Sequence, residues 1–575
     1  MVFLNINYYI RLLSLFVVMF FSLNLSANNN LDVFVVKAIS DKVILPGTKI
    51  ISGSLNKNTI NISACNGEYE PTSLIMRANY NISSVSVEVS DLKSINNVIS
   101  SSNVDIKIVK VWYQGGGAWE SRNLYKYKEK KLIPELLLND EMLVKVDTVN
   151  KENYLRVKSS AGNKYIHISK KGNLEKPLLH TLTGLNVQDS DKLQSFNLAR
   201  NENKQLWLTF NVPKNSINGL YKGVIKFKDK NGAVIKELNI QLNVLPFLLA
   251  KPSLIYSIYY RGKLNHKSPT VSSEFKNKKQ LMAELLNMKN HGVTNPSIYQ
   301  SLSDIRLLEE HLLIRDQLLM NDGVLYYLGI MTYPNKYKTL KNLGKMTSQI
   351  VNIAKKHNIT TVYVYGIDEA KDEKLKQQYD AWKVVHESGA KIFVAGYKGT
   401  SRHVGHSLDA LVFAGPPDAV EINMIHQYGN KIFSYNNPQS GPENPLVFRR
   451  NYGVVLWKNN YDGAMPYAYQ HSFGSAWNDV DHKKFRDHNF TYPAVDGVID
   501  TIAWEGFREG VDDVRYINTL ENIIKKAETL PEVTALSTLD AKEYLADLKN
   551  GKIDDLDEMR SSLITHILNI HALLD

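Results

Sequence analysis

Two adjacent acidic residues, Asp368 and Glu369, follow the apolar run Tyr363-Val364-Tyr365-Gly366-Ile367. Two carboxylates directly after a buried strand are unfavourable unless they are exposed or take part in chemistry. Repulsion between them would raise the pKa of one, which keeps an acid protonated near neutral pH. Breaking a glycosidic bond needs a protonated carboxyl beside the leaving oxygen and a second acidic group near the charged sugar ring. The pair therefore predicts glycosidic cleavage.

A structural alternative exists for the same pair. Asp368 could cap a helix that starts near Lys371, and Glu369 would then favour the N-terminus of that helix. Other residues that could line a site must decide between the two interpretations.

The expected position of a separate nucleophile carries no acid. In a barrel enzyme with two separate carboxylates it would lie near the end of the seventh strand, where this chain has Tyr435-Asn436-Asn437-Pro438. Either the base lies elsewhere or the substrate supplies its own nucleophile. In the second case a 2-acetamido carbonyl attacks the anomeric carbon, one carboxylate orients the amide nitrogen, and its neighbour protonates the leaving group. Tyr435 or Tyr397 would then hydrogen-bond the acetamido oxygen.

Aromatic side chains with amide or charged neighbours follow other apolar runs. Sugar rings stack on aromatic faces while their hydroxyls take hydrogen bonds, so such neighbours suit a sugar. The predicted substrate-binding residues are Tyr365, Tyr397, Tyr435, Asn436, Trp457, Asn459, Trp504, Glu505 and Arg508. Tryptophan is more often a core residue, and Arg508 could form a structural ion pair with Glu509, so both alternatives stay open. No metal site and no cofactor are predicted.

The elements that must position these residues alternate after Pro252. Eight short apolar runs predict strands, at residues 254–260, 295–299, 324–331, 361–367, 391–395, 410–414, 431–435 and 453–457. Amphipathic stretches between them predict helices. This alternation implies parallel strands, and eight of them close a (β/α)8 TIM barrel, whose working residues gather at the carboxyl ends of the strands. The alternative, an open doubly wound sheet, would need a glycine-rich phosphate turn, which Arg261-Gly262-Lys263 does not provide.

The rest of the chain differs in pattern from the barrel segment. From about residue 31 to residue 247, short alternating runs broken by Gly, Asn and Asp predict an antiparallel β-sandwich, with a clear hairpin turn at Asp229-Lys230-Asn231-Gly232. After Val511 the pattern is helical. The predicted parts are 1–27, a signal peptide; 28–250, an N-terminal β-sandwich; 251–515, the catalytic barrel; and 516–575, a C-terminal helical region.

The first residues resemble a secretory signal. Arg11 precedes a short apolar stretch at residues 12–21, and Leu25-Ser26-Ala27 offers a small-residue cleavage site. The apolar stretch is marginal for a membrane anchor and lacks a basic flank on its far side. We therefore expect export to the periplasm or the medium, and no transmembrane segment after signal removal.

The composition excludes several classes of protein. A single cysteine, Cys65, leaves no intramolecular disulfide and no Cys-rich metal or redox site. The formal net charge is +11, but the lysines and arginines are scattered and no nucleic-acid-binding motif accompanies them. For an exported protein this surplus fits an anionic glycan or cell-surface environment.

Several segments together resemble glycoside hydrolase family 123 and the related bacterial domain group that shares its barrel. They are residues 212–223 and 244–247 of the sandwich, the Asp368-Glu369 pair, residues 453–457 and, most specifically, residues 504–513. The resemblance implies an exo-acting β-N-acetylgalactosaminidase with substrate-assisted catalysis. It also implies that Glu369 is the acid/base and that Asp368 stabilises the oxazolinium intermediate. The sugar follows from the family and not from these residues.

Two other functions remain open. A glycosidase of another kind could act on a sulfated galactan, with a distant base such as Asp462 or Glu505, and the stereochemistry of the product would distinguish it. A non-catalytic carbohydrate-binding surface protein would contact glycan through the sandwich, but it would have no need for the Asp368-Glu369 pair. Each of these functions takes a glycan or glycoconjugate as partner and no nucleic acid.

Overall fold

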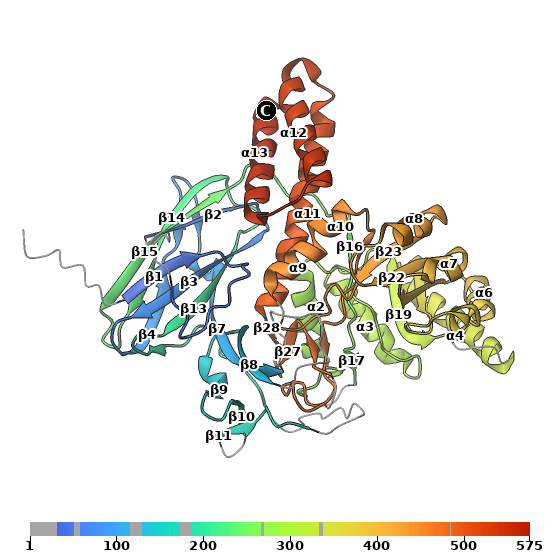
Figure 1. Cartoon of the computed structure of the whole chain (residues 1–575), viewed down its shortest axis with the longest axis horizontal. Coiled ribbons are helices and arrows are strands. Elements are labelled where there is room, and N and C mark those ends of the chain that lie inside the picture. Colours follow the sequence, from blue (N-terminus) through green and yellow to red (C-terminus); the bar gives the residue numbers. More distant parts are fainter. Residues whose placement is uncertain are drawn as a thin grey trace, which may run out of the picture.

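The computed structural model describes residues 31–50, 58–115, 129–159, 162–172, 186–265, 269–332, 337–442, 444–482 and 485–574. The predicted signal peptide, residues 1–27, lies outside the described residues. Figure 1 shows a β-rich N-terminal lobe on one side and a lobe of strands and helices on the other, with the C-terminal helices rising between them.

Two sheets face each other in the N-terminal lobe. The first has the order β1 (Leu31–Val36), β3 (Tyr69–Ala78), β13 (Asn203–Asn211), β7 (Val104–Gly115) and β8 (Lys130–Leu138). The second has the order β12 (Phe196–Leu198), β4 (Ile82–Val89), β14 (Gly219–Lys228), β15 (Val234–Val244) and β2 (Thr59–Ala64). In addition, β5 (Leu92–Lys93) pairs with β14, and β6 (Val98–Ile99) pairs with β5. Alternate side chains of both sheets, such as Leu74, Leu206, Ile225 and Leu242, are buried in one shared core.

The predicted hairpin is present. Strands β14 and β15 pair antiparallel, and the Gly232 N–H donates to the Asp229 carbonyl at 2.9 Å. The Asp229 carboxylate also accepts from the N–H groups of Asn231 and Ala233, which is the local bonding that favours Asp in turns.

Strands β7 and β8 continue beyond the sandwich toward the second lobe. They pack there with a three-stranded sheet of β9 (Val144–Asp147), β10 (Glu152–Ser159) and β11 (Gly162–His167). Trp112 of β7 is buried edge-on against Trp477 and Tyr492, which belong to the second lobe. The Gly115 N–H donates to Asp479 at 2.8 Å, so this extension holds a long loop of the second lobe.

A parallel sheet of seven strands forms the second lobe. Its order is β16 (Ile255–Tyr256), β24 (Gly463–Ala464), β23 (Lys431–Tyr435), β22 (Ala410–Ala414), β21 (Lys391–Gly396), β20 (Thr361–Tyr365) and β19 (Val324–Met331). Helices follow the strands on the outside, namely α2 (Lys278–Asn290), α3 (Ile305–Gln317), α4 (Tyr337–Lys356), α6 (Tyr379–Glu387) and α8 (Ala419–Gln427). The result is a half-barrel, and the predicted (β/α)8 barrel is present only in part.

The predicted strand at residues 295–299 is not a strand. The Ser297 N–H donates to the Ile258 carbonyl at 3.0 Å, and the Ile298 N–H donates to the Tyr326 carbonyl at 2.9 Å. This segment therefore touches both edges of the sheet through a few backbone hydrogen bonds and one bridge between Ile298 and Tyr327. Pro296 has no N–H to give to a ladder, which explains why no regular strand forms.

The predicted strand at residues 453–457 is also wrong. Residues Val454–Lys458 form the helix α10, and the two-residue strand β24 takes the eighth strand position instead. A short apolar run cannot be assigned to strand or buried helix by its pattern alone. The side chains that this run was expected to bring to the barrel mouth are therefore elsewhere.

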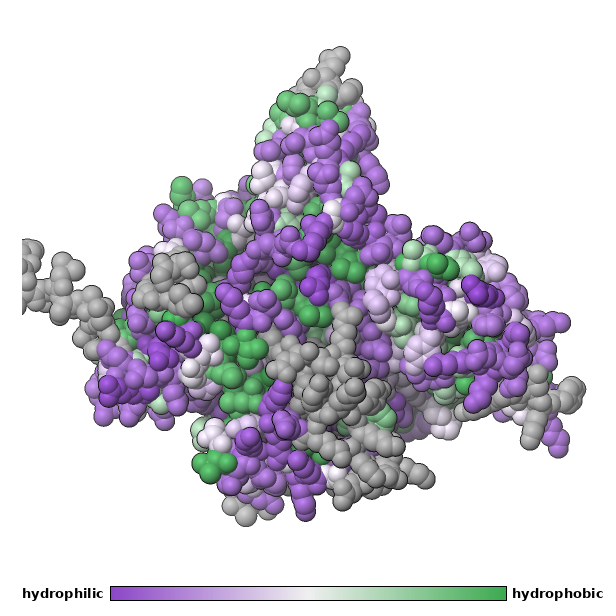
Figure 2. All heavy atoms as spheres, viewed as in Figure 1, coloured by the Kyte–Doolittle hydropathy of each residue, from purple (hydrophilic) through white to green (hydrophobic). Residues whose placement is uncertain are grey.

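The C-terminal helices are α9 (Pro445–Tyr452), α11 (Ile502–Ala527), α12 (Pro531–Asn550) and α13 (Leu556–Leu574). Helix α11 runs without a break through the boundary predicted at residue 515. Figure 1 shows α12 and α13 as a projecting pair, and Figure 2 shows a largely hydrophilic visible surface. Within the described residues, none of the helices combines the length and apolar character needed to cross a bilayer.

Buried ion pairs join these helices to the sandwich. Arg560 of α13 contacts Glu509 of α11 at 2.6 Å and Glu70 of β3 at 3.1 Å. Arg449 of α9 contacts Asp513 of α11 at 2.8 Å. Because these charges are removed from water, each depends on its partners to remain buried.

Candidate active site

Asp368 and Glu369 follow β20 at the carboxyl end of the parallel sheet. The Glu369 N–H donates to the Ala395 carbonyl of β21 at 3.2 Å, which ties the pair to the neighbouring strand. Glu369 has a φ of 49°, a left-handed conformation that is uncommon outside glycine. Asp368 is exposed and Glu369 is half-buried, so solvent reaches both residues.

The pair does not cap a helix. Helix α5 (Glu373–Lys376) begins later, and its N-cap residue is Asp372, which makes no side-chain cap hydrogen bond. The Asp368 carboxylate accepts from a tyrosine instead. The structural alternative raised by the sequence is therefore wrong, and the two carboxyls face other side chains.

Asp368 is held by a chain of two tyrosines. The Tyr365 hydroxyl donates to Asp368 Oδ1 at 2.6 Å, and the Tyr259 hydroxyl lies 3.1 Å from that of Tyr365. Although Asp368 is exposed as a residue, partial enclosure of its carboxyl raises its pKa, and the nearby charge of Glu369 raises it further, while the bond from Tyr365 opposes both. A raised pKa within the pair was predicted, but burial contributes more than the predicted repulsion.

Glu369 is held by tyrosines from two further strands. Tyr397, which follows β21, donates to Glu369 Oε2, and Tyr435 at the end of β23 donates to Oε1 at 3.1 Å. Gln439 donates in turn to the Tyr435 hydroxyl at 3.0 Å. Both oxygens of Glu369 thus have a phenol donor. The sequence predicted that these two tyrosines bind substrate, and here they position a carboxylate.

Arg261, Tyr299 and Tyr467 lie beyond Tyr259, and the sequence did not point to any of the three. The pair, its tyrosines and these three residues are called the mouth below. The Arg261 guanidinium donates to Tyr467 Oη at 3.3 Å and lies 5.3 Å from the centre of the Tyr299 ring. Tyr467 Oη lies 2.9 Å from His471 Nδ1. Burial, with the charges of Arg261 and His488, lowers the pKa of His471 to about 2, so its ring is neutral.

The two carboxyls belong to different halves of the mouth. Glu369 contacts tyrosines of β21 and β23. Asp368 accepts from Tyr365, and Tyr259, which follows Tyr365 in this chain of hydroxyls, lies 5.4 Å from Tyr467 between ring centres. The two carboxyls are therefore held by different tyrosines.

The other predicted binding residue near the pair is Asn436. It follows Tyr435 directly, is exposed, and has a φ of 50°. The structure thus brings together Tyr365, Tyr397, Tyr435 and Asn436 with Asp368 and Glu369.

Trp457 and Asn459 are not at the mouth. Trp457 lies on α10, where its indole N–H donates to Glu521 of α11 at 3.1 Å and Lys549 of α12 lies 4.6 Å from the ring centre. The Asn459 amide donates to the Val455 carbonyl at 2.8 Å. These contacts are helix packing, and they follow from the helix that replaced the predicted strand.

Trp504, Glu505 and Arg508 lie on α11 at the junction of the two lobes. Trp504 is fully buried and stacks on His291 with ring centres 4.7 Å apart. Glu505 pairs with Arg508 at 2.5 Å and accepts from Trp207 of the sandwich at 3.1 Å. Burial disfavours the ionised form of Glu505, but Arg508 and His291 outweigh burial and lower its pKa to about 2. Their packing is structural, and the ion pair foreseen for Arg508 is made chiefly with Glu505.

Asp462 and Glu505, the two residues considered as distant bases for another glycosidase, do not lie beside the pair. Glu505 already forms an ion pair with Arg508 at the junction of the lobes. Asp462 accepts from the Ile432 N–H at 2.8 Å and from His426 at 3.0 Å, at the amino end of β23. That end of the sheet is opposite to the pair, so neither residue can assist there.

One group of described residues has metal-ligand spacing, namely His291, Asp500 and Glu505. Arg508 already pairs with Glu505, and Lys107 lies 3.9 Å from Asp500. These cations neutralise the carboxylates, so the group is explained as part of the junction without an ion.

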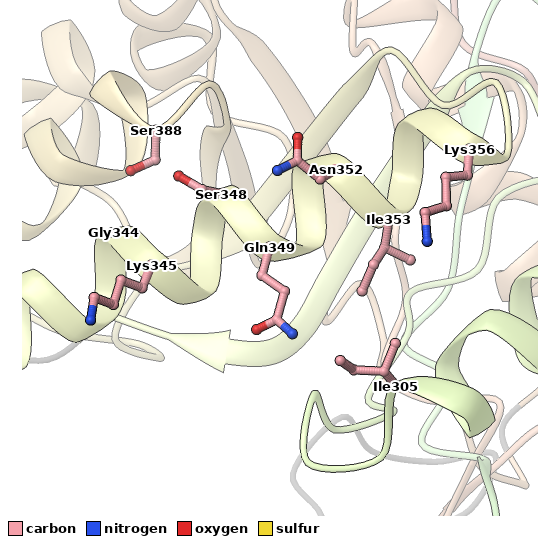
Figure 3. A pocket seen from close by; sticks show the side chains of 9 residues that line it. All are labelled: Ile305, Gly344, Lys345, Ser348, Gln349, Asn352, Ile353, Lys356 and Ser388. Atoms are coloured by element: carbon pink, nitrogen blue, oxygen red, sulfur yellow. The ribbon is translucent and has the colours of Figure 1, made fainter.

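Two hollows lie away from the pair. The first, of about 670 Å³, lies on the outer surface along α4, and Figure 3 shows Ile353 facing Ile305 across it. The second, of about 980 Å³, lies between the sandwich and the amino end of the sheet and is lined by residues such as Tyr69, Lys289 and Arg508. Neither is lined by Asp368 or Glu369.

Comparison with known proteins adds to this geometry. Residues 341–520 match the family described as glycoside hydrolase 123, catalytic domain. Among solved structures, the chain is similar to a family 123 glycoside hydrolase from Clostridium perfringens, studied for glycolipid glycan hydrolysis. The sequences are 14% identical, the match covers 94% of this chain and 98% of that chain, and the TM-score is 0.59. At this identity the likeness shows the fold alone.

A weaker likeness to a β-glucuronidase from Parabacteroides merdae has 9% identity, covers 77% of this chain and 66% of that chain, and has a TM-score of 0.31, which supports no conclusion. No curated protein sequence matches the chain significantly. The segment that matches the family contains Asp368, Glu369, Tyr397 and Tyr435. The resemblance predicted from the sequence is thus confirmed, because residues 341–520 match the catalytic domain of glycoside hydrolase family 123.

Proposed function

We propose that the protein is a retaining exo-glycoside hydrolase that removes terminal β-N-acetylgalactosamine, with the 2-acetamido carbonyl of the substrate as nucleophile. One observation carries the proposal. Two adjacent carboxyls after β20 accept from different tyrosines, while the end of β23 offers Tyr435 and Asn436 in place of a carboxylate. This arrangement supports participation by the substrate rather than by an enzyme nucleophile.

The reaction uses the two carboxyls in turn. Glu369 gives its proton to the glycosidic oxygen as the bond between this oxygen and the anomeric carbon breaks. The acetamido oxygen attacks the anomeric carbon from the other face and forms an oxazolinium ion, whose N–H is held by the Asp368 carboxylate. Glu369 then takes a proton from the water that opens this ring, so the product keeps the configuration of the substrate.

The tyrosines serve the same steps. Tyr397 and Tyr435 donate to the oxygens of Glu369, and a phenol donor stabilises a carboxylate more than a neutral acid. Their bonds therefore strengthen as Glu369 loses its proton, which lowers the energy of the transition state. Tyr365 and Tyr259 keep the Asp368 carboxyl in place for the amide.

The proposed substrates are glycans or glycolipids with terminal β-N-acetylgalactosamine. The similar Clostridium perfringens enzyme was studied on glycolipid glycans, which supports this class. Export, proposed from residues 1–27, would give the enzyme access to such substrates outside the cell.

Nitrophenyl β-glycosides of N-acetylgalactosamine, N-acetylglucosamine and galactose test the proposal. We expect turnover of the first, with the β-anomer appearing first by NMR, and no turnover of the galactoside, which lacks the acetamido group. Equal turnover of the galactoside would contradict substrate participation. Initial release of the α-anomer would contradict retention.

Glu369→Gln tests the acid role. We expect a loss of about 10²- to 10⁴-fold in kcat with a sugar leaving group, and a much smaller loss with a dinitrophenyl leaving group that needs no proton. Because Glu369 is only half-buried, the thermal melting curve should be unchanged. Full activity of the variant on a sugar leaving group would remove Glu369 from the mechanism.

A further inference from the structure

Lys371 and Tyr397 meet beside the acid/base residue. The Lys371 ammonium lies 4.4 Å from the centre of the Tyr397 ring, and the hydroxyl of that ring donates to Glu369. A cation over the face of a tyrosine is held by the ring's negative charge density. An otherwise mobile lysine is thus fixed next to Glu369.

Lys371 is exposed, and within the described part of the chain it forms no ion pair with a carboxylate. Other basic side chains near the mouth are already neutralised. Arg261 forms an ion pair with Glu274, and Lys398 lies 2.9 Å from Asp418. Lys371 therefore contributes a positive charge that is open to a ligand.

The ring under Lys371 is rigidly placed. The Tyr397 N–H donates to the Thr400 hydroxyl at 3.1 Å, and the Thr400 N–H donates back to the Tyr397 carbonyl at 3.0 Å. The buried Glu421 of α8 accepts from the backbone of Gly399 and Ser401, which fixes the start of α7 (Thr400–Val404). A rigid ring is a suitable wall for a subsite.

The position of Tyr397 relative to the two carboxyls indicates which part of the substrate it contacts. The acid/base must face the leaving oxygen, and Glu369 faces the β21 and β23 half of the mouth. Asp368, which would hold the acetamido group, accepts instead from Tyr365, whose hydroxyl lies 3.1 Å from that of Tyr259. Lys371 and Tyr397 therefore lie on the side where the sugar that departs must sit.

We propose that Lys371 and Tyr397 form a leaving-group subsite that selects an acidic sugar, one that carries a carboxylate or a sulfate. This inference rests on the proposed function and names the substrate class more closely. An anion on the departing sugar would pair with the free ammonium of Lys371. The positive net charge of the chain, +11, favours the approach of the same class of glycan.

The test compares disaccharides that differ only in the charge of the departing sugar. Terminal β-N-acetylgalactosamine is linked to glucose, to glucuronic acid or to a sulfated glucose, and kcat/KM is measured for each at low salt. We expect the acidic substrates to be preferred by about three- to fivefold, the size expected for one solvent-exposed charge pair. Added salt should remove the preference. The carboxylate and sulfate arms show which anion fits better.

Matched variants isolate the charge of Lys371. In Lys371→Met the ratio of kcat/KM for the acidic disaccharide to that for the neutral one should fall to about 1, and in Lys371→Arg the preference should persist. Lys398→Met removes a neighbouring charge that is already paired and should leave the preference intact.

An equal kcat/KM for neutral and acidic disaccharides in the unmodified protein, or an undiminished preference in Lys371→Met, would overturn the subsite while leaving the proposed function standing. Absence of turnover with every glycoside would overturn both.

Discussion

The protonation of Asp368 governs how this site should respond to pH. Its pKa is raised above the usual value for aspartate by burial and by the charge of Glu369. If the ionised carboxylate holds the acetamido group, activity falls as pH drops through this pKa. The acidic limb of kcat/KM should therefore lie at higher pH than the pKa of an ordinary aspartate, which is about 3.9.

Tyr365→Phe should move this limb to higher pH. The bond from Tyr365 to Asp368 Oδ1, at 2.6 Å, favours the ionised form and so lowers the pKa. Its removal lets the pKa rise further, and the pH profile of kcat/KM measures the change. Tyr397→Phe is the control, because Tyr397 contacts Glu369 and not Asp368. An unchanged acidic limb in Tyr365→Phe would show that Asp368 does not set it.

At the scale of elements, a substitution of Trp457 distinguishes its predicted role in sugar binding from its observed role in helix packing. Trp457→Ala should lower the free energy of unfolding by about 3–5 kcal/mol, since a buried ring is removed from the packing of α10, α11 and α12. The KM for the substrate should not change. Denaturant unfolding and steady-state kinetics measure the two effects. A raised KM with unchanged stability would restore the predicted contact with sugar.

The pair itself was predictable because it is local. Two acids after an apolar run can be recognised without knowledge of the rest of the chain, and β19 to β23 follow the predicted runs closely. Tyr259, Tyr299 and Tyr467 could not be found this way, because their meeting depends on which face of each strand or loop turns inward. Trp504 was assigned to the sugar because the charged residues Glu505 and Arg508 follow it in sequence, while its helix is buried at a junction.

The errors in strand prediction have the same origin. Residues 453–457 are apolar and β-branched enough for a strand, yet they form α10 because they pack against α9 and α11. Tertiary packing decides such short apolar runs. Pro296, in contrast, was visible in the sequence, and it should have counted against the strand at 295–299.

At the scale of the whole molecule, the ion-pair cluster between sandwich and helices should make stability depend on pH. Glu68 is buried, and its pKa is raised to about 7 by burial and by the charge of Asp512, although Arg560 opposes this. A proton is therefore bound more tightly in the folded protein than in the unfolded chain. The stability it contributes is present below about pH 4.5 and is lost as pH rises toward 7 and above.

Glu68→Gln should reduce this dependence. The amide keeps the shape of the side chain and has no proton to lose, so the melting temperature should fall less between pH 5 and pH 8 than in the unmodified protein. Glu237→Gln, at an exposed position of the same sandwich, is the control. Parallel pH curves for all three proteins would exclude Glu68 as the titrating group.

The extension of β7 and β8 beyond the sandwich determines whether the two lobes can be expressed separately. Trp112 closes a core whose other half, Trp477 and Tyr492, belongs to the lobe that carries the pair. In a shortened chain beginning at residue 251, those two rings would be exposed to water. The loop at residues 470–500 would also lose the hydrogen bond that Asp479 accepts from Gly115. The lobe that carries the pair thus depends on the N-terminal lobe to fold, and expressing it alone should yield aggregates rather than a smaller enzyme.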